Sequence, residues 1–513
     1  MNSLRLSLLS RVACCLCAVA SLTAAPTRAD EHVDRLNGLL PSVAADLRSD
    51  LRLLPLFAAM DSPPASLQDR NVTIYVAPDG PGWDAVEAWV QAESQRAVLD
   101  AIATVTERGA GFAFALPYGT AGLPQELIDA DAVVALGQDE LIAGATYGWM
   151  TLADRASILV HAEATRLTAA GDAQRALELL WRWAVLMRQV MDRPMILEVI
   201  WAGDEAIAAL DRMRDVAYLD LKGSVSLSPG GLAEITQGME LAEEALAFER
   251  WRLPEGERIA AEQLVNRVLG PGGSNERFGA VLARAEVSDR PLRLIGQAGR
   301  WATLAEAHAG RAETIAAINR VYGGALTKWQ APEHSPLLAT ASETQRIDMS
   351  RFGVLEGVFT ALRQPETMLG LRLRLRAEAV GTRQALALLG YRIRFGAPPP
   401  AISAIRPAWV ERLEVDPYNP DRADGARPPM NFYVPSRPPL RSPGAREIVV
   451  QGGIAGEFTF KPGPDDWVVY SYGPDNLGSF AERVHQGFLA PPATDLLIWP
   501  PATSLNRARL GGG

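Results

Sequence analysis

The residues best suited to catalysis or metal binding in this sequence are its five histidines, and their spacing points to neither. They are His32, His161, His308, His334 and His485. None of them begins a His-Glu-x-x-His motif, and no two are four residues apart, as two zinc ligands on one helix face would be. His161 and His308 each have a glutamate two residues away, which on a helix lies on a different face. We therefore expect histidines that are solvated or internally hydrogen-bonded.

The usual motifs of nucleophilic catalysis are absent from the sequence as well. It contains no Gly-x-Ser-x-Gly and no Ser-x-x-Lys. Only Lys222, Lys328 and Lys461 are lysines among the 50 basic residues, so Schiff-base chemistry has three candidates. A glycosidase needs two carboxylates facing each other across a cleft, which sequence spacing does not reveal. The sequence thus predicts no catalytic residue and no cofactor-binding residue.

Arginines and tryptophans offer two weaker signals. Arg372, Arg376 and Arg383 share one stripe of a long predicted helix. That stripe is either a site for an anion or acidic partner, or an exposed face that pairs with Glu378 and other acids. Twelve tryptophans could stack on sugars, but we expect scattered core and boundary positions. Trp181 and Trp183 are two apart on one helix, so at most one of them faces the core squarely.

The first 29 residues have the pattern of a secretory signal. Arg5 and Arg11 precede an apolar run from Val12 to Leu22, and Thr27-Arg28-Ala29 resembles an A-x-A cleavage site. Cleavage after Ala29 would leave 484 of the 513 residues and change the formal charge from −10 to −13. All three cysteines lie within the apolar run, so the mature chain would be free of cysteine. We expect an exported protein of the periplasm or the extracellular space.

Charge and hydropathy narrow the classes of partner. The acidic balance, 60 Asp+Glu against 50 Lys+Arg, argues against nucleic acid, which attracts a basic surface. No apolar stretch of 18 or more residues follows the signal, so no transmembrane segment is expected there. At about 150 residues per domain, the mature length predicts roughly three units.

The periodicity predicts a mainly α fold, with an irregular multi-helix body of αα-hairpins and a small C-terminal α+β module containing a short antiparallel sheet. In the N-terminal part, Asn71–Val76 and Gly111–Leu116 are the expected strands. Stripes of apolar residues at helical spacing on both sides of Gly171-Asp172 predict an αα-hairpin over 151–194. The predicted divisions are a signal at 1–29, an N-terminal α/β-containing segment at 30–150, a helical body at 151–364, a long helix with a small sheet at 365–490, and a flexible tail at 491–513.

A series of motifs in the C-terminal third carries a family resemblance. A helix ends in Leu389-Gly390-Tyr391, an Asp-Pro-aromatic box follows at Asp416-Pro417-Tyr418, and Tyr470-Ser471-Tyr472-Gly473-Pro474-Asp475 closes the series. Residues 370–480 resemble the C-terminal module of a group of uncharacterised exported bacterial proteins. That module is in turn similar to the C-terminal region of the major pseudopilin of type II secretion. The start of this chain lacks the pseudopilin cleavage motif, so it is not expected to be a pilin subunit.

The same resemblance implies a candidate metal site. In pseudopilins the closing loop can hold calcium through a carboxylate and backbone carbonyls, and Asp475 and Asn476 match the start of that loop. Calcium requires six to eight oxygen ligands. The segment Gly478–Glu482 supplies no second aspartate, so a simple turn is the competing interpretation.

Three functions are compatible with these observations. The leading hypothesis is an exported, non-enzymatic helical scaffold or protein-interaction protein with an unidentified protein partner. The alternatives are a carboxylate-based periplasmic or extracellular hydrolase, for example one directed at glycans, and an accessory subunit of an envelope secretion system. The sequence leaves the oligomeric state open.

Overall fold

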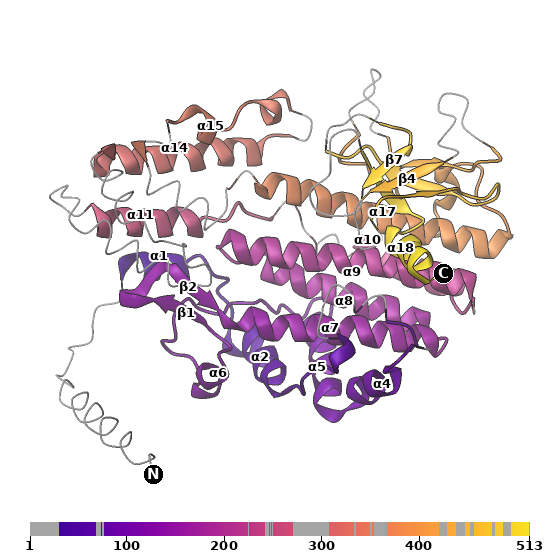
Figure 1. The fold of residues 1–513 in the computed structure, drawn as a ribbon, viewed down its shortest axis with the longest axis horizontal. Coiled ribbons are helices and arrows are strands. Elements are labelled where there is room, and N and C mark those ends of the chain that lie inside the picture. The colour runs from indigo at the N-terminus through magenta and orange to yellow at the C-terminus, as the bar shows by residue number, and fades with distance from the viewer. Residues whose placement is uncertain are drawn as a thin grey trace, which may run out of the picture.

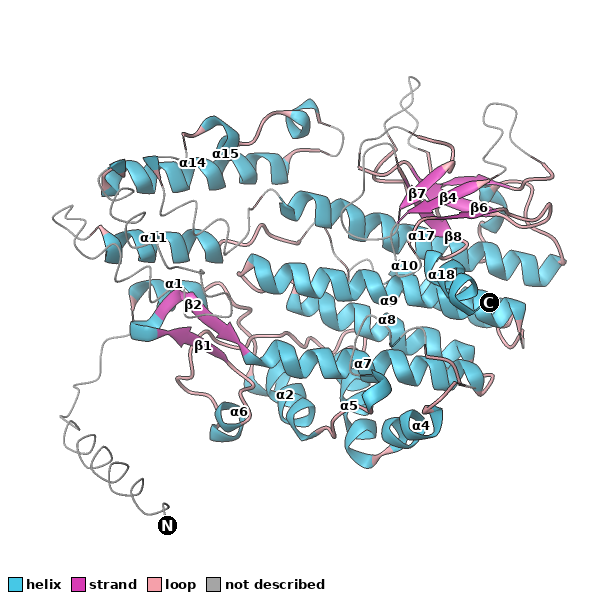
Figure 2. Cartoon of the chain, viewed as in Figure 1, coloured by secondary structure: helices cyan, strands magenta, loops and turns pink. Residues whose placement is uncertain are grey.

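The fold is defined by a computed structural model. It describes residues 30–511 apart from 68–72, 74–75, 79, 224, 242–245, 247, 249, 270–306, 333–334, 349–350, 353–364, 366, 420–427, 438–446, 452–455, 475–477 and 486–493. The described chain is mainly helical, with a two-stranded sheet and a separate six-stranded sheet (Figure 1, Figure 2). The prediction of a mainly α fold is confirmed.

Three long helices form the centre of the molecule. α7 (Gly148–Ala169) and α8 (Ala173–Val190) make the predicted αα-hairpin, and α9 (Ile196–Lys222) packs against both. Gly171 supplies the left-handed turn between the first two, with φ 76°, and the side chain of Asp172 caps α8 by accepting from the Arg175 amide. Apolar residues at helical spacing, among them Leu159, Leu180 and Trp183, place one stripe of each helix in the core.

Further helices cover this centre on several sides. Figure 1 shows the long helix α17 (Thr367–Phe395) crossing above α9, and α11 and α14 stacked beyond the end of α9. The remaining helices of the body are α10 (Pro229–Leu241), α11 (Gly256–Val268), α14 (Arg311–Gln330) and α15 (Glu343–Arg346). Among the described residues, none of the helices combines the length and apolar composition needed to cross a membrane.

Helices of the N-terminal segment pack against α7, and the sheet of this segment is not the one predicted. Its helices are α1 (Glu31–Asn37), α2 (Ser49–Ala59), α4 (Trp83–Gln91), α5 (Glu93–Val105) and α6 (Gln125–Asp129). The strands are β1 (Val134–Gly137) and β2 (Leu141–Tyr147), an antiparallel hairpin. The close approach of Gly137 to Gly144, where a side chain would not fit, lets these strands pair.

The two strands predicted in this segment are corrected accordingly. Within Asn71–Val76, Thr73 is helical and Val76 is irregular, and the other four residues lie outside the described part of the chain. Gly111–Leu116 forms no strand, and within the described chain its one pairing is an isolated bridge between Ala113 and Arg48. Alternating apolar residues were insufficient here because strand formation depends on a partner surface as much as on propensity.

The C-terminal sheet is larger than predicted and mixed. Its order is β3-β6-β8-β7-β4-β5, with β3 (Asn431–Tyr433), β4 (Ile448–Gln451), β5 (Phe458–Phe460), β6 (Val468–Ser471), β7 (Arg483–His485) and β8 (Asp495–Trp499). The β4–β7 and β7–β8 pairs are parallel, so the prediction of an antiparallel sheet is wrong for those pairs. The sheet contacts α17 through β6 and β8.

The predicted flexible tail at 491–513 is also corrected. Residues 495–499 are the interior strand β8, which is buried at every position, and Ala502–Gly511 form α18 on α9. Trp499 lies between the stacked ring of Trp467, at 5.3 Å between centroids, and Tyr218 of α9 at 5.4 Å. Prolines and the terminal glycines suggested disorder, but a run of four apolar residues that fills the centre of a sheet outweighs them.

One continuous apolar core links the N-terminal segment, the helical body, α17 and strands β6 and β8. It extends from Val33 to Trp499 and so crosses the predicted divisions at 150 and 364, while a smaller cluster lies within the C-terminal sheet. Trp409 is an example of this continuity. Its ring packs against Gly390 and Tyr391 of α17, and its indole N–H donates to the Pro229 carbonyl of α10 at 3.2 Å.

Gly390→Ala tests this close contact. A methyl group there would overlap the Trp409 indole, so we expect a loss of about 2 kcal/mol in the free energy of unfolding, read from denaturant titration. Gly370→Ala is the matched control on the same helix. No atom lies within 4 Å of a Cβ at this position, so helix propensity should stabilise the protein by up to about 1 kcal/mol. Equal effects of the two substitutions would contradict this packing.

Candidate functional site

A cavity of about 1090 Å³ lies where α5, α8 and α10 meet. We call it the α5–α8–α10 cavity. Its walls come from five parts of the chain: residues 38–42, the end of α5 with the loop to Phe112, the second half of α8 with the following turn, α10, and residues 250–255. The end of α5 is fixed to α8 because Gln189 donates to the Val105 carbonyl at 2.9 Å.

Charged side chains of both signs line this cavity. The cations are Arg108, Arg182, Arg188, Arg193, Arg250 and Arg252, and the anions are Glu107, Glu178, Asp192, Glu234 and Glu255. Apolar surface lies between them, mainly from Phe112, Trp181, Ile235 and Leu253. Trp183, two residues from Trp181, is fully buried in the core. Trp181 is only partly buried at the edge of the same core, so the expectation that at most one of these two tryptophans faces the core squarely is confirmed.

Several of the lining charges are already used within the protein. Arg188 donates to Asp192 at 2.6 Å, and Glu255 forms an ion pair with Arg258. Glu178 accepts from Gln174 at 3.3 Å. By contrast, Arg108, Arg182, Arg250 and Arg252 have no ion pair with any described residue, and the same is true of Glu107 and Glu234. The unpaired cations of the cavity therefore outnumber its unpaired carboxylates, and each guanidinium carries five N–H groups.

Arg193 is the deepest of the lining cations, with 1% of its surface exposed. Its Nε donates to Glu198 at 2.6 Å, and its Nη1 donates to the Leu116 carbonyl at 2.6 Å. The guanidinium also lies over the ring of Tyr118, 4.7 Å from the centroid. Its Nη2 has no hydrogen-bond partner among the described residues. A buried N–H left in this way costs free energy that a ligand acceptor would recover.

Glu198, the partner of Arg193, lies on α9 and is completely buried. It accepts from Arg193, from Trp149 Nε1 at 3.2 Å and from the Tyr118 hydroxyl. Burial raises the pKa of Glu198, and these donors act in the opposite direction. The cluster ties α9 to the segment before α6 and to α7.

A second buried carboxylate, Glu257, lies near Glu198. Its Oε1 accepts from the Ile196 amide at 2.6 Å, so Glu257 caps the beginning of α9 from the first turn of α11. Burial raises the pKa of Glu257 well above its ordinary value, and the charge of Glu198 adds to this effect. Neither carboxylate has exposed surface or lines the cavity. Both carboxylates therefore hold elements of the fold together, and they do not face each other across an open cleft.

Helix α9 carries further buried charges towards its C-terminal end. Asp215 accepts from Arg507 of α18 at 2.5 Å and also pairs with Arg212. Arg214 forms an ion pair with Glu378 of α17, with 2.7 Å between nitrogen and oxygen. Burial alone raises the pKa of Glu378, but the guanidiniums of Arg214 and Arg374 outweigh it and hold the pKa below its usual value.

One interpretation of the arginine stripe on α17 was an exposed face that pairs with acids. In the structure Arg372 and Arg376 are half-buried and Arg383 is buried. Arg383 is 3% exposed and forms an ion pair with Glu414, and Arg374 is 7% exposed and donates to Glu378 at 2.9 Å. Arg372 lies over the Trp329 ring at 4.7 Å and donates to its carbonyl at 3.0 Å. These arginines hold α17 against its neighbours.

The histidines are dispersed over the described chain. His32 contacts Asp30 at 3.0 Å and Asn266 at 3.2 Å, His161 is buried in α7, and His485 is buried in β7. His308 contacts the Ala309 carbonyl at 2.7 Å, and His334 lies outside the described residues. In the part of the chain that the structure describes, no three or more His, Cys, Asp or Glu side chains gather in a way that could hold a metal ion.

The calcium candidates Asp475 and Asn476 also lie outside the described residues. Two motifs that precede them in the chain do meet. Asp416 of the Asp-Pro-aromatic box accepts from the Ser471 hydroxyl at 2.7 Å and from the Tyr418 amide at 3.0 Å. Asp495 of β8 accepts from the Ala481 amide at 2.7 Å and from Ser479.

Asp416 gives a pH-dependent prediction. Burial raises its pKa from 3.8 to about 6, so the folded protein binds a proton that the unfolded chain releases between these pH values. Stability is therefore lost as the pH rises from about 4 to 6, by about 3 kcal/mol, and stays lower above pH 6. Asp416→Asn should raise the melting temperature at pH 8 and leave it unchanged at pH 3.5. Ser471→Ala serves as a control for the loss of the hydroxyl donor alone, and a lower melting temperature for Asp416→Asn at pH 8 would contradict this account.

Comparison with known proteins finds no relative of this chain. No protein-family model matches it, no curated protein matches it, and no solved structure matches it. The resemblance of residues 370–480 to exported bacterial proteins and to the major pseudopilin stays a prediction. What the cavity binds therefore has to follow from its own side chains.

Proposed function

We propose that this protein is an exported, non-enzymatic helical scaffold whose α5–α8–α10 cavity binds an acidic segment of a partner protein. The observation that carries the proposal is the surplus of unused guanidinium donors in the cavity, with the partly satisfied Arg193 at its inner end. Guanidinium groups bind carboxylates through paired hydrogen bonds, which makes a carboxylate the best complement.

The overall charge of the chain strengthens this argument. The protein is acidic, with a formal charge of −10, yet four arginines without ion pairs gather around one cavity. These arginines outnumber Glu107 and Glu234, the lining carboxylates without an ion pair to any described residue, and a ligand that brings negative charge would balance them. The site is therefore electrostatically prepared for an acidic ligand.

Size and apolar surface favour a polypeptide segment over a small ion. At about 1090 Å³, the cavity is at the upper end of the range for small-molecule sites. Phe112, Trp181, Ile235 and Leu253 provide the apolar contacts that a peptide of several residues would cover. Trp181 stands at the cavity wall on a helix whose opposite face is anchored by Trp183.

The scaffold half of the proposal is supported by how the cavity walls are held. Gln189 joins α8 to α5, and Arg193 joins the turn after α8 to Leu116 and to Glu198 of α9. Binding surfaces built on helices that are fixed in this way lose little conformational entropy when a ligand binds. The hydrolase and secretion-accessory functions stay predictions.

A glutamate decapeptide is the probe that tests the cavity. We expect it to bind the mature protein at low ionic strength and to change the fluorescence of Trp181, while a lysine decapeptide should not bind. The double variant Arg182→Glu with Arg252→Glu should weaken binding at least tenfold, because each charge-assisted hydrogen bond contributes about 1.5–3 kcal/mol. Isothermal titration calorimetry measures the affinity, and added salt should weaken it.

The double variant Arg320→Glu with Arg509→Glu provides the matched control. These arginines are exposed on α14 and α18, outside the cavity lining, so the same change of charge should leave the affinity unaltered. Equal loss in both variants would show general attraction and would contradict the proposal, as would no binding of the glutamate peptide. Binding of tetragalacturonate without binding of the peptide would overturn the choice of a protein partner in favour of an acidic glycan.

A further inference from the structure

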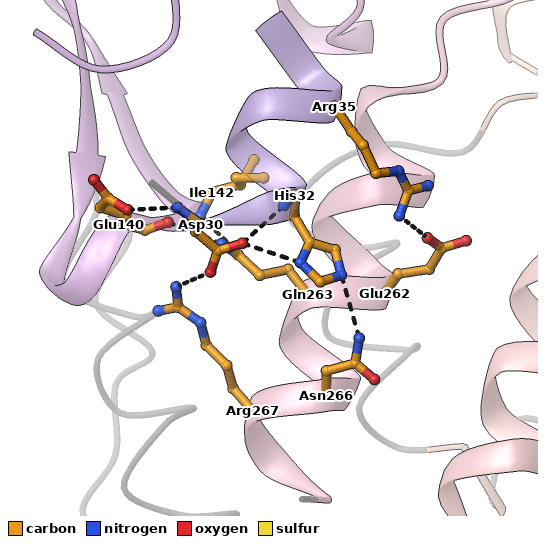
Figure 3. Close-up of polar contacts among 9 residues, drawn as sticks. All are labelled: Asp30, His32, Arg35, Glu140, Ile142, Glu262, Gln263, Asn266 and Arg267. Carbon is orange, nitrogen blue, oxygen red and sulfur yellow. Dashed lines mark hydrogen bonds and ion pairs between the residues drawn. The ribbon is translucent and has the colours of Figure 1, made fainter. Parts of the chain in front are cut away.

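Asp30 is the first residue that the structure describes, and it lies where three elements converge. Figure 3 shows it between the turn of the β1–β2 hairpin, the start of α1 and the face of α11. Its backbone nitrogen donates to Oε2 of Glu140 at 3.1 Å. Its carboxylate accepts from Arg267 of α11 at 2.6 Å and from the His32 amide at 2.9 Å. The sequence pattern independently places signal cleavage on the N-terminal side of this residue.

We propose that processing between Ala29 and Asp30 creates an α-ammonium group that forms part of the folded structure through an ion pair with Glu140. An export-processing endopeptidase would hydrolyse this amide bond with one water molecule. Ala29 leaves with the new carboxylate, and the nitrogen of Asp30 keeps its place and takes up protons to become –NH₃⁺. The inference rests on the export half of the proposed function and not on the cavity.

The Glu140 carboxylate is held where this pairing requires it. Gln263 of α11 donates to the Glu140 carbonyl at 2.9 Å and accepts from the Ile142 amide at 2.8 Å, so it holds the backbone that leads from Glu140 into β2. Glu140 has φ 59°, a left-handed conformation that is unfavourable for a residue with a long side chain. Glycine or asparagine would fit the turn more easily, and neither could receive an ammonium group as an ion pair.

The charges around this nitrogen are favourable for a cation. Glu140 comes from the hairpin, Asp30 and Glu31 from the start of α1, and Arg267 is neutralised by its own pairing with Asp30. His32 faces Asp30 at 3.0 Å and Asn266 at 3.2 Å. Although partial burial raises it, hydrogen bonds from Arg267 and His32 lower the pKa of Asp30 to about 2, so this carboxylate stays charged.

Two negative carboxylates beside the new amine should raise its pKa above the ordinary value of about 8. A cation whose pKa is raised on folding stabilises the protein below that ordinary value, and the contribution disappears as the pH rises through the folded-state pKa. Glu140 is exposed, so screening by water and salt keeps the effect small. The reactivity of the amine is the more sensitive measurement.

The first experiment is N-terminal sequencing of the full chain after expression in an export-competent bacterial host. We expect a mature protein that begins at Asp30. A chain that keeps residues before Asp30, or that begins after it, overturns the inference.

The second experiment measures acylation of the α-amine at pH 7.5 by an N-hydroxysuccinimide ester, followed by mass spectrometry. Only the neutral amine reacts, so a pKa raised by about 0.5–1 unit slows the reaction roughly three- to tenfold. Glu140→Gln should remove that protection. Glu126→Gln, an exposed acid on α6, is the matched control and should react at the wild-type rate.

A variant with one serine inserted between Ala29 and Asp30 keeps the test independent of any change at Glu140. It moves the amine away from the carboxylate while leaving the turn intact, so it should react as fast as Glu140→Gln. Wild-type rates in both variants overturn the ion pair even if the chain begins at Asp30. Failure of peptide binding at the α5–α8–α10 cavity would leave this result unaffected.

Discussion

The structure depends on the neutralisation of charges buried along α9. From one end to the other, this helix carries Glu198, Glu205, Arg212, Arg214 and Asp215 with almost no exposed surface. An ionised group out of water is costly unless it is paired and hydrogen-bonded. Each of these side chains therefore needs a hydrogen-bond or ion-pair partner, and other helices supply many of these partners. Ser157 of α7 and Trp183 of α8 donate to Glu205, for example, and Thr382 of α17 accepts from Arg214.

This requirement explains why the helices assemble in one arrangement. Apolar contacts alone tolerate sliding and exchange of similar surfaces, whereas a misplaced charge in the core has no acceptable alternative partner. The pairs on α9 point towards α7, α8, α17 and α18, so they fix four neighbours relative to a single helix. These contacts also position one wall of the α5–α8–α10 cavity. Arg193, which lines the cavity, is held by Glu198 of α9.

Local patterns in the sequence were sufficient for the elements that depend on periodicity. The hairpin of α7 and α8 follows from apolar stripes and from Gly171-Asp172, which are signals within a few residues of each other. The charges on α9 and α17 could not be interpreted in this way. Arg374 and Arg383 resemble members of a solvated face, and only their pairing with Glu378 and Glu414 allows them to be buried.

The C-terminal sheet and the cavity could not be predicted from the sequence, because both depend on contacts between residues far apart in the chain. β8 is short and follows prolines, and it becomes a strand because β6 and β7 are there to receive it. The cavity is assembled from residues between 38 and 255 that no motif connects. The contact between Asp416 and Ser471 joins two of the motifs noted in the C-terminal third, although spacing alone could not show that they touch.

The position of α18 has a consequence for how α9 acquires its partners during folding. Arg507 and Ser504, which hydrogen-bond to Asp215, lie 292 and 289 residues further along the chain. Until this distant segment docks, α9 lacks two partners and the sheet lacks its interior strand. Contacts of such long sequence separation slow folding, because a large loop has to close before they contribute any stability.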